Sequence, residues 1–127
     1  MPLVEITYAP HVPHTVLKEL AAILPHAVSV AVECPEEPYD GDLQPGDVEL
    51  RFRPRGPFDV SGVDIVVEVK SKWFESRAAN RQSRVDGLCK AVEDVVGFAD
   101  VGVYLSLPVA AWAQSDLATD ARSRASS

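Results

Sequence analysis

The chain of 127 residues has few cysteines, few aromatic side chains and fewer basic than acidic residues. Cys34 and Cys89 are its only cysteines, a number typical of reduced core residues rather than of a disulfide framework. The formal net charge is −7, and no run of Lys and Arg forms a stripe that could follow phosphates, which argues against nucleic acid as a partner. The N-terminus has no basic region followed by an apolar run, and the apolar stretches fall short of a membrane span. We therefore expect a cytoplasmic protein with no membrane partner.

Several common chemical motifs are also missing. The sequence has no phosphate-binding Walker loop, no Rossmann glycine pattern and no Gly-x-Ser-x-Gly elbow. His11 and His14 have HxxH spacing but no further ligands near them in the sequence, so we expect neither a metal site nor a cofactor. Four acidic residues are most simply interpreted as part of a solvated loop: Glu36, Glu37, Asp40 and Asp42.

The composition is that of a folded single domain. Hydrophobic residues make up 46% of the chain and charged residues 24%. A chain of this length buries about two-thirds of its unfolded surface, which is enough for a core without staples. We expect one domain over residues 1–114. The residues 115–127 are mostly Ser, Ala, Asp and Arg, and we expect them to be a disordered tail.

Hydrophobic periodicity predicts the elements. The expected strands are residues 2–8, 48–53, 63–70 and 101–107, and the expected helices are residues 16–31 and about 76 or 80 to 96. Thr15 is the expected N-cap of the first helix, Pro25 should kink or restart it, and Gly97 should end the second. The third strand is rich in β-branched residues, which is typical of a strand covered on both faces. The order predicts an α/β fold of two consecutive β-α-β units, a two-layer sandwich with a four-stranded mixed sheet and two helices.

Pro2 is the strongest candidate for chemistry. Removal of Met1 before a small residue would leave a secondary amine at the start of a strand. In an apolar pocket near cations, such an amine loses basicity, because desolvation and like charge both disfavour its protonated form. A neutral amine can act as a general base or as a nucleophile towards carbonyls. The alternative is that Pro2 simply follows Met1, as proline does in many chains.

Basic residues on strand faces could bind an anionic substrate. Arg51 and Arg53 point the same way from the second strand, and Lys70 and Lys72 do so at the end of the third, next to Trp73. An arginine binds a carboxylate through two parallel hydrogen bonds and can polarise a carbonyl. The alternative is that the two arginines form ion pairs with acids such as Glu49 or Glu68. Tyr104 lies in the middle of the fourth strand, where its hydroxyl could orient substrate or serve a structural purpose.

Met1-Pro2 opening a strand, with two successive β-α-β units, resembles the tautomerase superfamily. That superfamily includes 4-oxalocrotonate tautomerase, 5-carboxymethyl-2-hydroxymuconate isomerase, macrophage migration inhibitory factor and the cis-3-chloroacrylic acid dehalogenases. The resemblance covers about residues 2–112. Residues 101–108 look like the last strand of the long-chain members, and residues 48–53 look like their arginine-bearing second strand.

The resemblance implies a cofactor-free isomerase that forms a homotrimer, with each pocket completed by a neighbouring subunit. Pro2 would be the base that moves a proton between oxygen and carbon of an enol. On this basis we expect the catalytic residues to be Pro2, Arg51 and Tyr104, and the residues that bind a small keto or enol carboxylate to be Arg53, Lys70, Lys72 and Trp73. Lysines stand where the family often has arginine at the end of the third strand. No counterpart of the water-activating acid of the dehalogenases is present, which favours tautomerisation over hydrolytic dehalogenation.

Two other functions remain open from the sequence. A decarboxylase or hydratase could use the same scaffold and a similar pocket. A non-catalytic trimeric module that binds a ligand or another protein is the third possibility. Retention of Met1 would favour that module, because Pro2 would then have no basic nitrogen.

Overall fold

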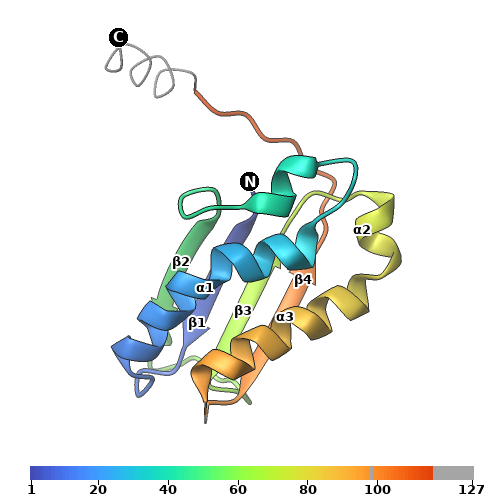
Figure 1. Cartoon of the computed structure of the whole chain (residues 1–127). Coiled ribbons are helices and arrows are strands. Elements are labelled where there is room, and N and C mark those ends of the chain that lie inside the picture. Colours follow the sequence, from blue (N-terminus) through green and yellow to red (C-terminus); the bar gives the residue numbers. More distant parts are fainter. Residues whose placement is uncertain (98, 116–127) are drawn as a thin grey trace.

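The computed structural model describes residues 1–97 and 99–115, which form a four-stranded sheet with helices on one face (Figure 1). Its elements are, in chain order, β1 (Leu3–Tyr8), α1 (His14–Val32), the 3₁₀-helix η1 (Pro38–Asp42), β2 (Glu49–Pro54), β3 (Ile65–Lys70), α2 (Glu75–Ala79), α3 (Arg81–Val96) and β4 (Val101–Ser106). The strand order is β2-β1-β3-β4. β1 is parallel to β2, β3 is parallel to β4, and the two pairs meet antiparallel at β1 and β3. The predicted α/β sandwich of two β-α-β units on a mixed sheet is confirmed.

The first helix differs from its prediction at two points. Pro13, in an extended conformation, is the N-cap and makes no side-chain capping bond, whereas Thr15 lies inside the helix, so the predicted Thr15 cap is wrong. α1 also continues through Pro25 as one element of 19 residues, so the helix does not restart there, one of the two alternatives expected at this proline. An interior proline costs about 3 kcal/mol. Leu20, Leu24 and Val28 are fully buried on the same helix, and each contributes about 1.5–3 kcal/mol, which exceeds that cost.

The second predicted helix is two helices. α2 and α3 are separated at Asn80, whose φ of −124° and ψ of 38° are not helical. The expected C-terminal cap is confirmed, because Gly97 has a φ of 68° and its N–H donates to the Glu93 carbonyl. The described part of the chain therefore has three α-helices, one more than the two expected, besides the 3₁₀-helix η1.

The core lies between the sheet and the helices. It consists of apolar side chains from the central strands β1 and β3 and of the apolar faces of α1 and α3. Its fully buried members include Val4, Ile6, Leu20, Leu24, Val28, Ile65, Val67, Val69 and Val92. The other face of β3 is not covered, since Val66 and Glu68 are half-buried and Lys70 is exposed. The expectation that β3 is covered on both faces is therefore wrong for the single chain.

The acidic loop after α1 is part of the structure rather than a solvated connection. Asp40 and Leu43 are buried, with 2% and 3% of their surface exposed. The expectation of a wholly solvated loop is thus wrong at Asp40, although Glu36 and Asp42 are exposed. Both cysteines are free thiols, as expected. All of the predicted tail except residue 115 lies outside the described residues.

α1 is long and apolar enough, by length and composition alone, to cross a membrane. The expectation that no apolar stretch reaches that length is therefore wrong. Core helices of globular folds meet the same criterion, and the inner face of α1 is buried against the sheet. Packing in the core accounts for the apolar character of this helix.

Candidate active site

Pro2 lies at the edge of the hydrophobic core. It is buried and immediately precedes β1, and its carbonyl accepts a hydrogen bond from the Glu49 N–H at 3.1 Å. Side chains alternate between faces along a strand, so Pro2 shares the helix-covered face with Val4. The antiparallel register pairs Leu3 with Lys70, which places Pro2 beside Ser71, itself 5% exposed. Met1 precedes it and is half-buried.

Most of the predicted partners of Pro2 lie on the opposite face of the sheet. In register, Arg51 is paired with Glu5, Lys70 with Leu3 and Tyr104 with Glu68, all on the face that the helices leave open. Tyr104 is 70% exposed there. Within one chain, the structure does not bring these side chains to Pro2.

The cations on this open face are paired with acids. The Arg51 Nε lies 3.7 Å from Glu49, the Arg53 Nη2 lies 3.1 Å from Glu5, and the Lys70 Nζ lies 3.6 Å from Glu68. The alternative that the arginines form cross-strand ion pairs is confirmed for Arg53, which pairs with Glu5 of β1, whereas Arg51 pairs with Glu49 of its own strand. Such exposed pairs contribute about 0–1 kcal/mol each. The hollow beside them has a volume of about 50 Å³, which is too small for a substrate.

Lys72 and Trp73 lie at the same end of the sheet as Pro2. The Lys72 Nζ donates to the Glu37 carboxylate at 3.1 Å. The backbone N–H of Trp73 donates to the Pro108 carbonyl, and the residue is 47% exposed. Of the predicted substrate-binding residues, these two are the ones that follow β3 where β1 begins.

Sequence reasoning missed a buried charge cluster at this end of the sheet. Arg77 is completely buried, and its Nη2 pairs with Asp40 at 3.0 Å. The guanidinium also donates to the carbonyls of Val32 and Lys72 and to the Ser71 Oγ, over 2.6–2.9 Å. The two partners are 37 residues apart in sequence, and no spacing or periodicity links them.

The two carboxyl groups of the cluster have pKa values displaced in opposite directions. Burial first, and then the hydrogen bond and charge of Glu37, raise the pKa of Asp40, while the charges of Arg77 and the amino terminus oppose the rise. Burial also acts to raise the pKa of Glu37, but hydrogen bonds to Asp40 and Lys72 and the nearby positive charges lower it overall.

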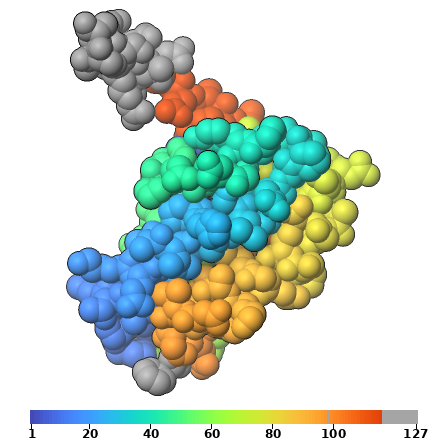
Figure 2. Space-filling view, viewed as in Figure 1, coloured from blue at the N-terminus to red at the C-terminus, as the bar shows by residue number. Residues whose placement is uncertain are grey.

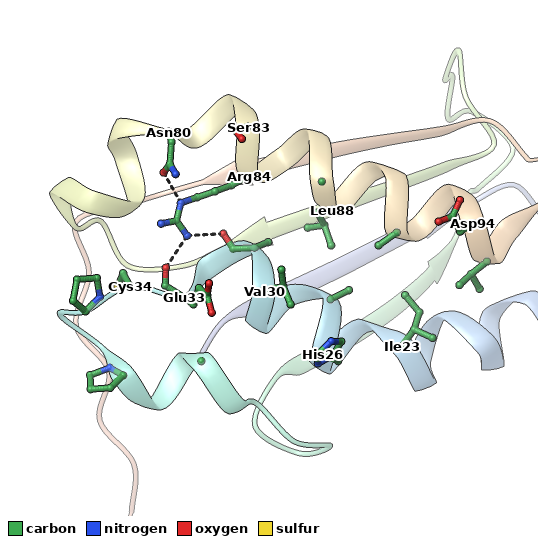
Figure 3. Close-up of a pocket in the computed structure, with 18 residues that line it drawn as sticks. Ile23, His26, Val30, Glu33, Cys34, Asn80, Ser83, Arg84, Leu88 and Asp94 are labelled. Carbon is green, nitrogen blue, oxygen red and sulfur yellow. Dashed lines mark hydrogen bonds between the residues drawn. The ribbon is translucent and has the colours of Figure 1, made fainter.

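The larger hollow is a groove of about 970 Å³ on the outer surface, between α1 and α3 (Figure 3). Arg84 crosses one end of it, donating to Asn80 and to the carbonyls of Ala31 and Glu33. Those bonds satisfy the last carbonyls of α1, so Arg84 is occupied with capping that helix. Pro2 borders neither this groove nor the smaller hollow. Among the described residues, no three His, Cys, Asp or Glu side chains gather as a metal site.

Comparison with known proteins identifies the fold. No family model matches the chain, and no curated protein matches it. A malonate semialdehyde decarboxylase structure superposes with a TM-score of 0.61 at 17% identity, over 94% of this chain and 98% of that one. A macrophage migration inhibitory factor-like protein from Entamoeba histolytica gives 0.58 at 17% identity, over 90% and 95%. A fused 4-OT symmetric trimer gives 0.57 at 17% identity, over 92% and 98%.

The chain has the fold of the tautomerase superfamily. The similarity extends over nearly the whole chain. At these identities the shared feature is the fold, and the chemistry has to be argued from this chain's own residues.

Proposed function

We propose that this protein is a cofactor-free tautomerase in which Pro2, freed by removal of Met1, is the general base for enol–keto proton transfer on a small carboxylate-bearing substrate. The observation that carries the proposal is the position of Pro2. It opens a central strand of a tautomerase fold and is buried beside Ser71, at the end of the sheet that holds Lys72 and Arg77. Poor solvation and nearby cations both favour the neutral form of an amine, and the neutral amine is the form that acts as a base.

The proposed site includes a second subunit. Within one chain, Arg51, Arg53 and Tyr104 face away from Pro2, so they could act on a substrate at Pro2 only across a subunit contact. The open sheet face that carries them, with half-buried Val66 and partly exposed Leu3, is a surface that another chain could cover. We therefore propose a homotrimer in which the substrate carboxylate is held by cations of two subunits: Lys72 and Trp73 belong to the end near Pro2, and Arg51, Arg53, Lys70 and Tyr104 belong to the neighbour.

The test begins with the N-terminus. Mass spectrometry of the intact protein should show loss of Met1. Ketonisation of phenylenolpyruvate should then fall by about 10²–10⁴-fold in Pro2→Ala, the usual contribution of a positioned general base. Pro10→Ala is the matched control, because Pro10 is exposed in the turn after β1 and its replacement should leave the rate unchanged. Full activity in Pro2→Ala would refute the proposed base, and a retained Met1 would favour the non-catalytic module.

A decarboxylase or hydratase is the second candidate, and the observation that favours it is a carboxyl group at the same end of the sheet as Pro2: Asp40 pairs with Arg77, which also donates to the Ser71 hydroxyl. A nearby carboxylate stabilises a protonated amine, which would make Pro2 an acid rather than a base. The similar malonate semialdehyde decarboxylase is described as having decarboxylase and hydratase activities. The pH dependence of kcat separates the candidates: activity that rises as the amine loses its proton indicates a base, and activity that falls indicates an acid.

A further inference from the structure

A defined segment of the chain lies at the end of the sheet where Pro2 is buried. Residues 33–43, which we call the acidic strap, leave the end of α1, form η1 and lie next to the point where β1 begins (Figure 1). On the surface, the strap and the residues after it cover this end of the sheet (Figure 2). Pro2 is buried and borders neither hollow. A substrate that reacts at Pro2 therefore needs an opening at this end of the molecule.

The strap is fastened to α1 at Ser29. The Ser29 Oγ donates to the Asp40 carbonyl at 2.6 Å and accepts from the Leu43 N–H at 3.0 Å. Ser29 is 2% exposed, so these bonds are shielded from water. This contact is neutral and uses backbone groups of the strap, so its strength does not depend on charge.

Three acidic side chains fasten the other side of the strap to residues 71–77. Glu36 accepts from the Ser76 hydroxyl at 2.6 and 2.8 Å, Glu37 from Lys72 at 3.1 Å, and Asp40 from Arg77 at 3.0 Å. The first contact is exposed and the second half-exposed, whereas the Asp40–Arg77 pair is buried on both sides. A buried ion pair is costly to break from one side, because the remaining charge is left without a partner.

The two halves of this buried pair are held differently. Arg77 has three further acceptors, Val32, Ser71 and Lys72, none of which belongs to the strap. It therefore keeps its place if the strap moves. Asp40 is the only strap residue that contacts the guanidinium among the described hydrogen bonds and ion pairs. Asp40 is thus the movable half of the contact, and Arg77 is the fixed half.

We propose that the acidic strap is a lid over Pro2 and that Asp40, bound to the fixed Arg77, is the latch that holds it closed. Opening breaks the Asp40–Arg77, Glu37–Lys72 and Glu36–Ser76 contacts and the two bonds to Ser29, and it uncovers the start of β1. That this opening admits substrate rests on the proposed function of Pro2. The opening itself does not, so it can be measured in a protein with no known substrate.

Cys34 provides a reporter of the opening. It lies in the strap and is 7% exposed, and the Cys89→Ser background leaves it as the single thiol. In that background, Asp40→Asn should raise the rate of Cys34 alkylation by N-ethylmaleimide about tenfold or more, since the buried Arg77 guanidinium loses its charged partner in the strap. Asp42→Asn is the matched control. It removes the same charge from an exposed strap residue and should change the rate less than about twofold.

Hydrogen exchange of the unmodified protein provides a test that needs no variant. The lid requires the Asp40 and Leu43 amides, bonded to Glu37 and Ser29, to exchange through a local opening faster than the amides of β1 and β3. Exchange of these amides only with global unfolding would overturn the lid, and so would equal alkylation rates in the two variants. If the protein is an active tautomerase but neither alkylation nor exchange detects an opening, the lid is wrong and the proposed function stands. If the strap opens but the protein has no tautomerase activity, the proposed function is wrong and the lid stands.

Discussion

Asp40 and Glu37 are the residues whose ionisation has the clearest consequence for stability. The pKa of Asp40 is raised above its ordinary value of 3.8, so its contribution to stability is present below that pH and is lost as the pH rises through the folded-state pKa. The pKa of Glu37 is lowered from 4.5, so its contribution is present above that pH and is lost as the pH falls through its folded-state pKa. The two effects oppose each other, so each carboxyl group has to be tested by its own substitution.

Denaturant unfolding across the range from about pH 3 to 8 measures these contributions through the free energy of unfolding. Asp40→Asn should flatten the decline above pH 3.8, and Glu37→Gln should flatten the decline on the acid side. Asp42→Asn, on the exposed part of the strap, should reproduce the curve of the unmodified protein. The interpretation fails if Asp40→Asn leaves the slope above pH 3.8 unchanged.

At the scale of elements, two glycines, one inside α3 and one at its C-terminal cap, should respond oppositely to replacement by alanine because their backbone conformations differ. Gly97 ends α3 with a φ of 68°, a region that side chains disfavour, whereas Gly87 lies inside the helix. An added Cβ would meet nothing within 4 Å at either position. Packing is therefore equal at the two sites, and only the backbone conformation differs.

We expect Gly97→Ala to destabilise the protein by about 1–2 kcal/mol, because an L-residue is strained at positive φ. Gly87→Ala should stabilise it by about 0.5–1 kcal/mol, because alanine loses less backbone entropy in a helix. Thermal or denaturant unfolding of the two variants measures both changes. Equal effects of the same sign would contradict the assignment of Gly97 as the cap.

At the scale of the whole molecule, the open face of the sheet and the outer face of the helix layer each expose an apolar side chain to water. The helix layer covers one face of the sheet, and the other face carries Leu3, which is 39% exposed on a central strand. The outer surface of α1 carries Val30, which is 57% exposed. The proposed homotrimer covers the sheet face and leaves the helix face in water.

This proposal predicts that the protein is a trimer by native mass spectrometry and by light scattering after size-exclusion chromatography. Leu3→Glu should dissociate it, because a charge without a partner would be buried in the subunit contact. Val30→Glu makes the same change on the helix face and should leave the trimer intact. A monomeric native protein would refute the proposed assembly. Dissociation by Val30→Glu alone would place the subunit contact on the helices instead.

Much of the fold follows from local patterns that the structure confirms. Alternation along β1 and β2 predicted which residues face the core, and the stripe of α1 predicted its packing side. The same alternation already separates Pro2, which shares a face with Val4, from Arg51 on the polar face of β2. The sequence therefore already indicated that Pro2 and Arg51 lie on opposite sides of the sheet within one chain. The family resemblance placed both in one site, which requires that the second residue come from another subunit.

The sequence by itself determined the order of the elements, the face of each strand residue and the proline at the start of β1, because each depends on neighbours a few positions away. Only the tertiary structure decided that Asp40 is buried and paired with Arg77. An acid in a loop and an arginine in a short helix have no local preference for each other. They meet because the sheet brings the end of α1 and the end of β3 to one place, where the buried guanidinium requires a counter-charge.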